Sequence, residues 1–158
     1  MSNSSPFKFD NYQVEDSVGY LLARARTMLS KAADESLGEL GITHGQASIF
    51  ILLAMDKCNT AADLARELFI DSAAMKRMLD RLEAKGFVER TPDPHDKRLF
   101  KLALSDAGKQ LALNIPGIFA DVLNVGFTGF SPEEIGFLKS LLRKLLANRP
   151  LLESKNTN

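Results

Sequence analysis

Apolar residues recur at three- and four-residue steps along most of the chain, and this periodicity predicts a mainly helical protein. The first apolar stripe predicts a long helix over about 12–37, which Gly38 and Gly41 end. Thr43 is a suitable N-cap for a second helix, and Gln46 stands where a capping-box partner is expected. A short glycine-containing connection therefore separates the first two predicted helices.

Two short helices with facing apolar sides come next. Thr60 can cap a third helix over 61–68, and Asp71 can cap a fourth over 71–85. Gly86 ends the fourth helix. Because only a few residues separate these two helices, the pattern predicts a helix-turn-helix.

Two apolar segments, Phe87–Arg90 and Leu99–Leu104, are predicted to be strands. The charged segment Thr91–Arg98 joins them, so the strands form a β-hairpin. A hairpin that follows a helix-turn-helix is a wing. A cationic helix beside such a hairpin, with arginine near the hairpin tip, is typical of a DNA-binding protein.

The rest of the chain predicts two longer helices. Ser105 caps one that runs to about residue 128, and Pro116 inside it predicts a kink or break. The other has a complete start signal, and Pro150 is expected to stop it. That signal consists of a capping serine, a first-turn proline and a capping-box glutamate: Ser131, Pro132 and Glu134.

These elements predict three parts: an N-terminal dimerisation helix over 1–41, a winged helix-turn-helix over 42–104, and C-terminal dimerisation helices over 105–158. The fold class is mainly α with a small β-hairpin. The outer helices need a surface for their apolar stripes. They could pack on each other within one chain, whereas a two-fold dimer would bury more and provide two readers for two half-sites. An aromatic set in the last helices is expected in the dimer core, with a ligand site as the alternative: Phe119, Phe127, Phe130 and Phe137.

Composition agrees with a soluble, cytoplasmic protein: 45% of the residues are hydrophobic and 25% are charged. A lone cysteine excludes an intramolecular disulfide, and it fits a reducing compartment. We expect no signal peptide, and no stretch approaches the ~20 apolar residues of a membrane span. The sequence has no nucleotide-binding loop and no metal-spaced His/Cys cluster, so neither an enzyme nor a cofactor is predicted.

The net charge is zero, but the charges are unevenly distributed. Residues 71–101 hold eight Lys or Arg and six Asp or Glu, which gives +2. Residues 1–57 hold five and seven, which gives −2. The positive side therefore coincides with the predicted helix and wing.

Three sequence runs carry a family resemblance. Residues 80–90 read Asp-Arg-Leu-Glu-Ala-Lys-Gly-Phe-Val-Glu-Arg, 93–98 read Asp-Pro-His-Asp-Lys-Arg, and 102–108 read Leu-Ala-Leu-Ser-Asp-Ala-Gly. On these runs the chain resembles a MarR-type transcriptional regulator over about 12–147. The resemblance implies an obligate dimer on a pseudo-palindromic operator, and a cleft where small, often aromatic, acids lower the affinity for double-stranded DNA.

The fourth helix supplies most of the expected DNA contacts. Ser72 and Lys76 are expected at phosphates and Arg77 at a base edge, with guanine favoured. The family often has polar residues where this chain has Ala73 and Ala74, so methyl contacts to thymine are expected there instead. The alternative for the polar positions is a solvated helix face.

In the wing, Arg98 is expected to enter the minor groove, which concentrates negative potential. Asp96 could hold its guanidinium group, and His95 and Lys97 are expected beside phosphates. The alternative is a solvent-exposed hairpin ion pair of ~0–1 kcal/mol. Arg81 is interpreted as bracing the wing more than as contacting DNA.

A carboxylate effector needs a cation and a hydrogen-bond donor. The candidates for its site by position are Tyr20, Arg24, Met28, His44 and Gln46. Alternatively, His44 only belongs to a first helical turn and Arg24 to a salt bridge at the dimer interface.

The leading hypothesis is a homodimeric repressor released by a small aromatic acid or phenol. One rival is a DNA-binding regulator switched by oxidation of Cys58, although the peroxide-sensing branch of the family carries its cysteine in the first helix, where this chain has none. The other rival is a module that binds a protein partner and no DNA.

Overall fold

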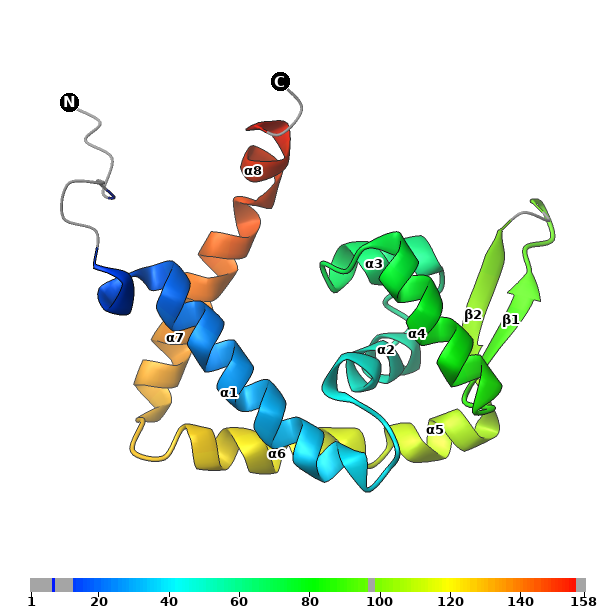
Figure 1. The fold of residues 1–158 in the computed structure, drawn as a ribbon, viewed down its shortest axis with the longest axis horizontal. Coiled ribbons are helices and arrows are strands. Elements are labelled where there is room, and N and C mark those ends of the chain that lie inside the picture. The colour runs from blue at the N-terminus through cyan, green and yellow to red at the C-terminus, as the bar shows by residue number, and fades with distance from the viewer. Residues whose placement is uncertain (1–6, 8–12, 97–98, 156–158) are drawn as a thin grey trace. The chain divides into compact units, whose positions relative to one another are not determined.

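The computed structural model describes residues 7, 13–96 and 99–155. It divides by packing into two compact units, one ending at Leu123 and one beginning at Asn124. The first unit contains the helix-turn-helix and the hairpin, together with the helices that flank them in sequence (Figure 1). Its elements are η1 (Val14–Asp16), α1 (Val18–Gly38), α2 (His44–Ala54), α3 (Ala61–Glu67), α4 (Ser72–Ala84), β1 (Val88–Pro92), β2 (Phe100–Leu104), α5 (Asp106–Ala112) and most of α6 (Ile115–Gly126).

The second unit contains the end of α6, then α7 (Pro132–Ala147) and α8 (Arg149–Lys155). The predicted fold class, mainly α with a small antiparallel hairpin, is therefore confirmed. Among the described residues, no helix is both long and apolar enough to cross a membrane.

Capping side chains start the helices at the positions that the sequence predicts. Thr43 and Gln46 form a capping box, in which Gln46 N donates to Thr43 Oγ1 at 3.3 Å and Thr43 N donates to Gln46 Oε1 at 3.1 Å. Asp71 Oδ1 accepts a hydrogen bond from the amide of Ala74 at the start of α4. Local capping side chains therefore mark where these helices begin.

The break predicted near Pro116 is confirmed, whereas the prediction that Pro150 stops the last helix needs correction. The single helix expected from Ser105 to about 128 is two helices, α5 and α6, and Pro116 is the second residue of α6. Pro150 does not stop the last helix: α7 ends at Ala147, and Pro150 is the second residue of α8. A proline lacks the amide hydrogen that a first turn leaves unused, so both prolines begin helices here.

The chain turns from α4 into β1 at Gly86, which has a φ of 73°. Gly86 N donates to Glu83 O and Phe87 N donates to Leu82 O, the paired bonds of a Schellman motif. Because the Phe87 amide completes the helix end, β1 begins one residue later than predicted, at Val88. The register runs from Val88 opposite Leu104 to Pro92 opposite Phe100.

The core of the first unit is continuous from α1 to α6. It includes Ala33 and Leu37 of α1, and Ala112 and Ile115 beyond the hairpin. Packing therefore crosses residues 41 and 104, where the sequence predicts domain boundaries, and that three-part division stays a prediction. The largest fully buried side chains are Phe50, Leu37, Ile49, Leu64, Met75, Leu79, Leu82, Ile115 and Val88.

Apolar stripes outside this core are exposed. In α1 they include Val18, Leu21, Leu22 and Met28. In the second unit, Phe137 is 72% exposed, and five leucines of α7 and α8 are also exposed. Those leucines are Leu141, Leu145, Leu146, Leu151 and Leu152.

Gly108 is the point where α5 meets the hairpin. A Cβ built on it would lie 2.1 Å from the carbonyl oxygen of Phe87, which is backbone and cannot rotate away. Gly108→Ala should therefore lower the free energy of unfolding by about 1–3 kcal/mol in a thermal or urea melt. Gly117→Ala is the matched helical control, since nothing lies within 4 Å of its added Cβ. A Gly108→Ala variant as stable as Gly117→Ala would contradict this packing.

Candidate nucleic-acid interface

Helix α4 has one buried face and one exposed face. A helix that contacts DNA needs the first to pack in the core and the second to face the DNA. Met75, Leu79 and Leu82 are at most 1% exposed and pack in the core. The residues expected to contact DNA lie on the other face, where Ser72, Ala73, Lys76 and Arg77 are exposed and Ala74 is half-buried. Burial of the inner face therefore fixes which side chains α4 presents outward.

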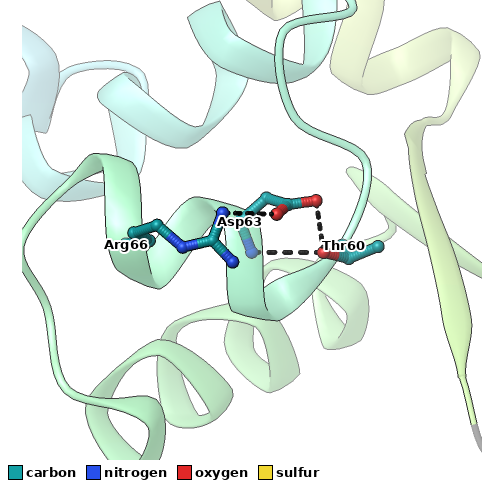
Figure 2. Close-up of polar contacts among 3 residues, drawn as sticks. All are labelled: Thr60, Asp63 and Arg66. Carbon is teal, nitrogen blue, oxygen red and sulfur yellow. Dashed lines mark hydrogen bonds and ion pairs between the residues drawn. The ribbon is translucent and has the colours of Figure 1, made fainter.

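Helix α3, the first helix of the helix-turn-helix, has its start fixed by three side chains (Figure 2). Thr60 Oγ1 accepts a hydrogen bond from Asp63 N at 3.1 Å and donates to Asp63 Oδ2 at 2.7 Å. Asp63 Oδ1 lies 3.2 Å from Arg66 Nη1 in an ion pair. The carboxylate thus stabilises the N-terminal turn of α3, as its position near the positive helix end favours.

The segment before α3 is also attached to the wing. Leu102 N, in β2, donates to Asn59 O at 2.7 Å. Asn59 immediately precedes the capping Thr60, so this backbone bond fixes the start of α3 relative to β2.

A second connection joins the wing to α4 through Arg90, a residue that we did not single out from the sequence. Arg90 Nη2 donates to Asp80 Oδ1 at 2.6 Å, and Arg90 Nε lies 3.2 Å from Glu83 Oε2. The second contact is an ion pair without hydrogen-bond geometry. Asp80 and Glu83 are three residues apart and so share one face of α4. Two carboxylates at this spacing, followed by an arginine in the next strand, are the sequence signal for this contact.

The expected brace at Arg81 has no such contact in the part of the chain that the structure describes, where its side chain is exposed. The ion pairs at this end of α4 belong to Arg90 instead. Arg81 as a brace therefore stays a prediction without a described partner.

The wing turn is described up to Asp96 and again from Leu99. Asp93 Oδ1 accepts hydrogen bonds from the amides of His95 and Asp96, and both of these residues are exposed. Lys97 and Arg98 lie outside the described residues. The expected contact between Asp96 and the Arg98 guanidinium is accordingly untested.

Three of the five effector-site candidates lie together on α1. Tyr20, Arg24 and Met28 line a surface hollow of about 360 Å³, with Lys31 on the same face. Arg24 Nη1 donates to the Tyr20 hydroxyl at 3.3 Å, and its guanidinium carbon lies 5.6 Å from the ring centroid. The hollow thus combines two cations, a hydroxyl and an apolar side chain.

The other two candidates already have structural partners. The His44 ring lies 5.6 Å from the Phe119 ring, and its amide donates to Asp34 Oδ1 at 2.5 Å. Gln46 is buried, and its Oε1 accepts the capping-box hydrogen bond from Thr43. One site that includes all five candidates stays a prediction.

Cys58 is buried, with 8% of its surface exposed. Burial raises the pKa of its thiol, and the nearby carboxylates of Glu67 and Asp63 raise it further. Since the thiolate is the reactive form, this environment disfavours oxidation.

The Arg90 contacts predict a specific difference between two arginines. Arg90→Met should lower the free energy of unfolding by about 1 kcal/mol, because it removes a half-buried hydrogen-bonded ion pair from between β1 and α4. Arg81→Ala, the control of equal charge change, should shift it by less than about 0.5 kcal/mol. Chemical denaturation measures both values. A larger loss for Arg81→Ala would show that Arg81 is the brace.

Comparison with known proteins supports the resemblance seen in the motifs. A family model described as the MarR family matches residues 42–100, which span the helix-turn-helix, β1 and the wing turn as far as the first residue of β2. The multiple antibiotic resistance protein MarR of Escherichia coli (strain K12) is 31% identical over 130 residues, covering 82% of this chain and 90% of that protein. The organic hydroperoxide resistance transcriptional regulator of Bacillus subtilis (strain 168) is 30% identical over 142 residues, covering 88% and 93%.

A solved structure shows the same fold. Mutant MarR from E. coli complexed with operator DNA superposes with a TM-score of 0.75 at 30% identity, covering 82% of this chain and 93% of that chain. Sequence identity over most of both chains and agreement of the folds point to the same assignment. The chain belongs to the MarR family, whose members are transcriptional regulators and not enzymes.

Proposed function

We propose that this protein is a homodimeric repressor that binds a pseudo-palindromic operator and is released by a small aromatic acid or phenol. The observation that carries the proposal is α4, which is fixed in the core by one face and presents Lys76 and Arg77 on the other. A relative of 30% identity was solved with operator DNA, and this supports the same role here.

In the proposed complex, α4 enters the major groove. Arg77 reads a base edge, while Ser72 and Lys76 bind phosphate oxygens beside it. The methyl groups of Ala73 and Ala74 contact thymine. The positive end of the α4 dipole further favours phosphate near its first turn.

The wing is proposed to enter the adjacent minor groove through Arg98, with His95 and Lys97 near phosphates. Arg90 and the Asn59–Leu102 bond connect the hairpin to the helix-turn-helix. Helix and wing would therefore approach DNA as one body.

The exposed apolar stripes support the proposed dimer. One lies along α1, and another includes Phe137 and Leu141 of α7. Each stripe contains several exposed apolar side chains on one element, and contiguous apolar patches mark interaction sites. A two-fold dimer formed through them would place two readers on two half-sites one helical turn, ~34 Å, apart. We further propose that it acts in the cytoplasm.

The α1 hollow is the proposed effector site. Arg24 and Lys31 offer cations for a carboxylate, while Tyr20 and Met28 offer apolar contact for an aromatic ring. A ligand that favours a spacing of the readers unlike the half-site repeat would release DNA. The loss of operator affinity that a ligand causes cannot exceed the difference between the ligand's affinities for the two reader spacings.

Fluorescence anisotropy with the DNA upstream of the protein's own gene tests the proposal, at fixed salt and with a panel of benzoates and phenols. Arg98→Ala should weaken binding by ~1–3 kcal/mol, and Arg77→Ala should relax the preference at one base position. Arg24→Ala should weaken the response to the active compound without weakening DNA binding.

Selective binding that one compound abolishes is the expected result. Unchanged affinity in Arg98→Ala would contradict the wing contact. No selective binding to upstream DNA or to operators selected from random sequence would contradict the DNA role and favour a protein partner.

The burial of Cys58 predicts that oxidation does not control DNA binding, whereas a redox switch at Cys58 predicts that it does. We expect Cys58→Ser to bind operator like the wild type, and we expect mild peroxide to leave the affinity of both proteins unchanged. Anisotropy after peroxide treatment measures this. Release of DNA by the wild type alone would establish Cys58 as the switch.

A further inference from the structure

We propose that Asp93 is a positioning residue for DNA binding, because its carboxylate organises the backbone of the wing turn. The inference rests on the proposed function, since the turn matters for binding only if the wing approaches DNA.

One carboxylate oxygen satisfies two backbone amides of the turn. Asp93 Oδ1 accepts hydrogen bonds from His95 N at 2.8 Å and from Asp96 N at 3.2 Å. Pro94, between Asp93 and His95, has no amide hydrogen. An aspartate that bonds the amides two and three residues ahead acts as a turn template, in the same way as a helix N-cap.

Backbone hydrogen bonds close the turn on both sides. Asp93 N donates to Leu99 O at 2.8 Å, and Leu99 N donates to Asp96 O at 2.9 Å. The amides of Asp93, His95, Asp96 and Leu99 therefore all have partners, and two of them depend on the Asp93 side chain.

The second carboxylate oxygen is directed to the strand. Asp93 Oδ2 lies 3.6 Å from Lys101 Nζ in β2, and the Asp93 side chain is only 18% exposed. The His95 amide, followed by the Asp96 amide and Lys101, holds the pKa of Asp93 below its ordinary value against the opposing effect of burial. The carboxylate is therefore ionised at neutral pH, with Oδ1 accepting two hydrogen bonds and Oδ2 in an ion pair.

A carboxylate on a DNA-facing loop would otherwise oppose binding, because it repels phosphate. If Asp93 were only a surface charge, removing it would strengthen binding. If it orders the turn, removing it leaves an ordering cost to be met on binding, and binding weakens. The two interpretations thus predict opposite signs for one substitution.

Amide hydrogen exchange in the DNA-free protein tests the turn directly. Asp93→Ala should speed exchange at His95 and Asp96 about tenfold, as expected for loss of an N-cap-like acceptor. Asp93→Asn keeps an oxygen acceptor at the same place and should leave exchange near the wild-type rate. Thermal unfolding identifies any variant that has lost its fold.

Operator affinity, measured by anisotropy, tests the consequence. Asp93→Ala should bind about tenfold more weakly, and Asp93→Asn should recover most of that loss. Glu89→Ala is the matched control, because it removes an exposed carboxylate of β1 for which the described residues show no hydrogen bond or ion pair. It should bind as tightly as the wild type or slightly more tightly.

The outcomes separate the inference from the proposed function. Selective wild-type binding with Asp93→Ala unweakened, or with exchange at His95 and Asp96 unchanged, overturns the inference alone. Equal losses in Asp93→Asn and Asp93→Ala would also overturn it, because charge and not the acceptor would then be responsible. A wild-type chain that selects no DNA overturns the proposed function and the inference together.

Discussion

Burial of one face of α4 is the constraint on which the rest of the structure depends. Met75, Leu79 and Leu82 are removed from solvent, and each contributes about 1.5–3 kcal/mol of hydrophobic stabilisation. The helix cannot rotate about its axis without exposing them. The cationic face that includes Lys76 and Arg77 is therefore held outward by packing of the opposite face.

Contacts with the same helix also fix the position of the wing. The Schellman turn at Gly86 directs the chain from α4 into β1, and Arg90 returns from β1 to the carboxylates of Asp80 and Glu83. Leu102 adds a backbone bond to the segment before α3. These contacts join helix and wing into one body, so an effector would act more readily on the spacing between two such bodies than on either one.

The sequence predicts what local chemistry determines. The caps at Thr43 and Asp71 and the apolar face of α4 involve residues within a few positions of each other, so pattern alone locates them. The Arg90 contact with Asp80 spans ten residues and joins β1 to α4, so the apolar periodicity that locates the helices does not reveal it. The break near Pro116 is predictable because proline disfavours a helix interior, but the prediction for Pro150 is wrong because a proline that ends one helix and one that begins the next look alike in sequence.

Hydroxyl-radical footprinting of the upstream DNA with the purified protein tests the central claim, that α4 and the wing form a rigid reader used in pairs. The account predicts two protected segments on one side of the duplex, centred about one helical turn apart, ~34 Å, with flanking minor-groove protection from the wings. A single protected segment, or protection spread evenly along the DNA, would contradict it.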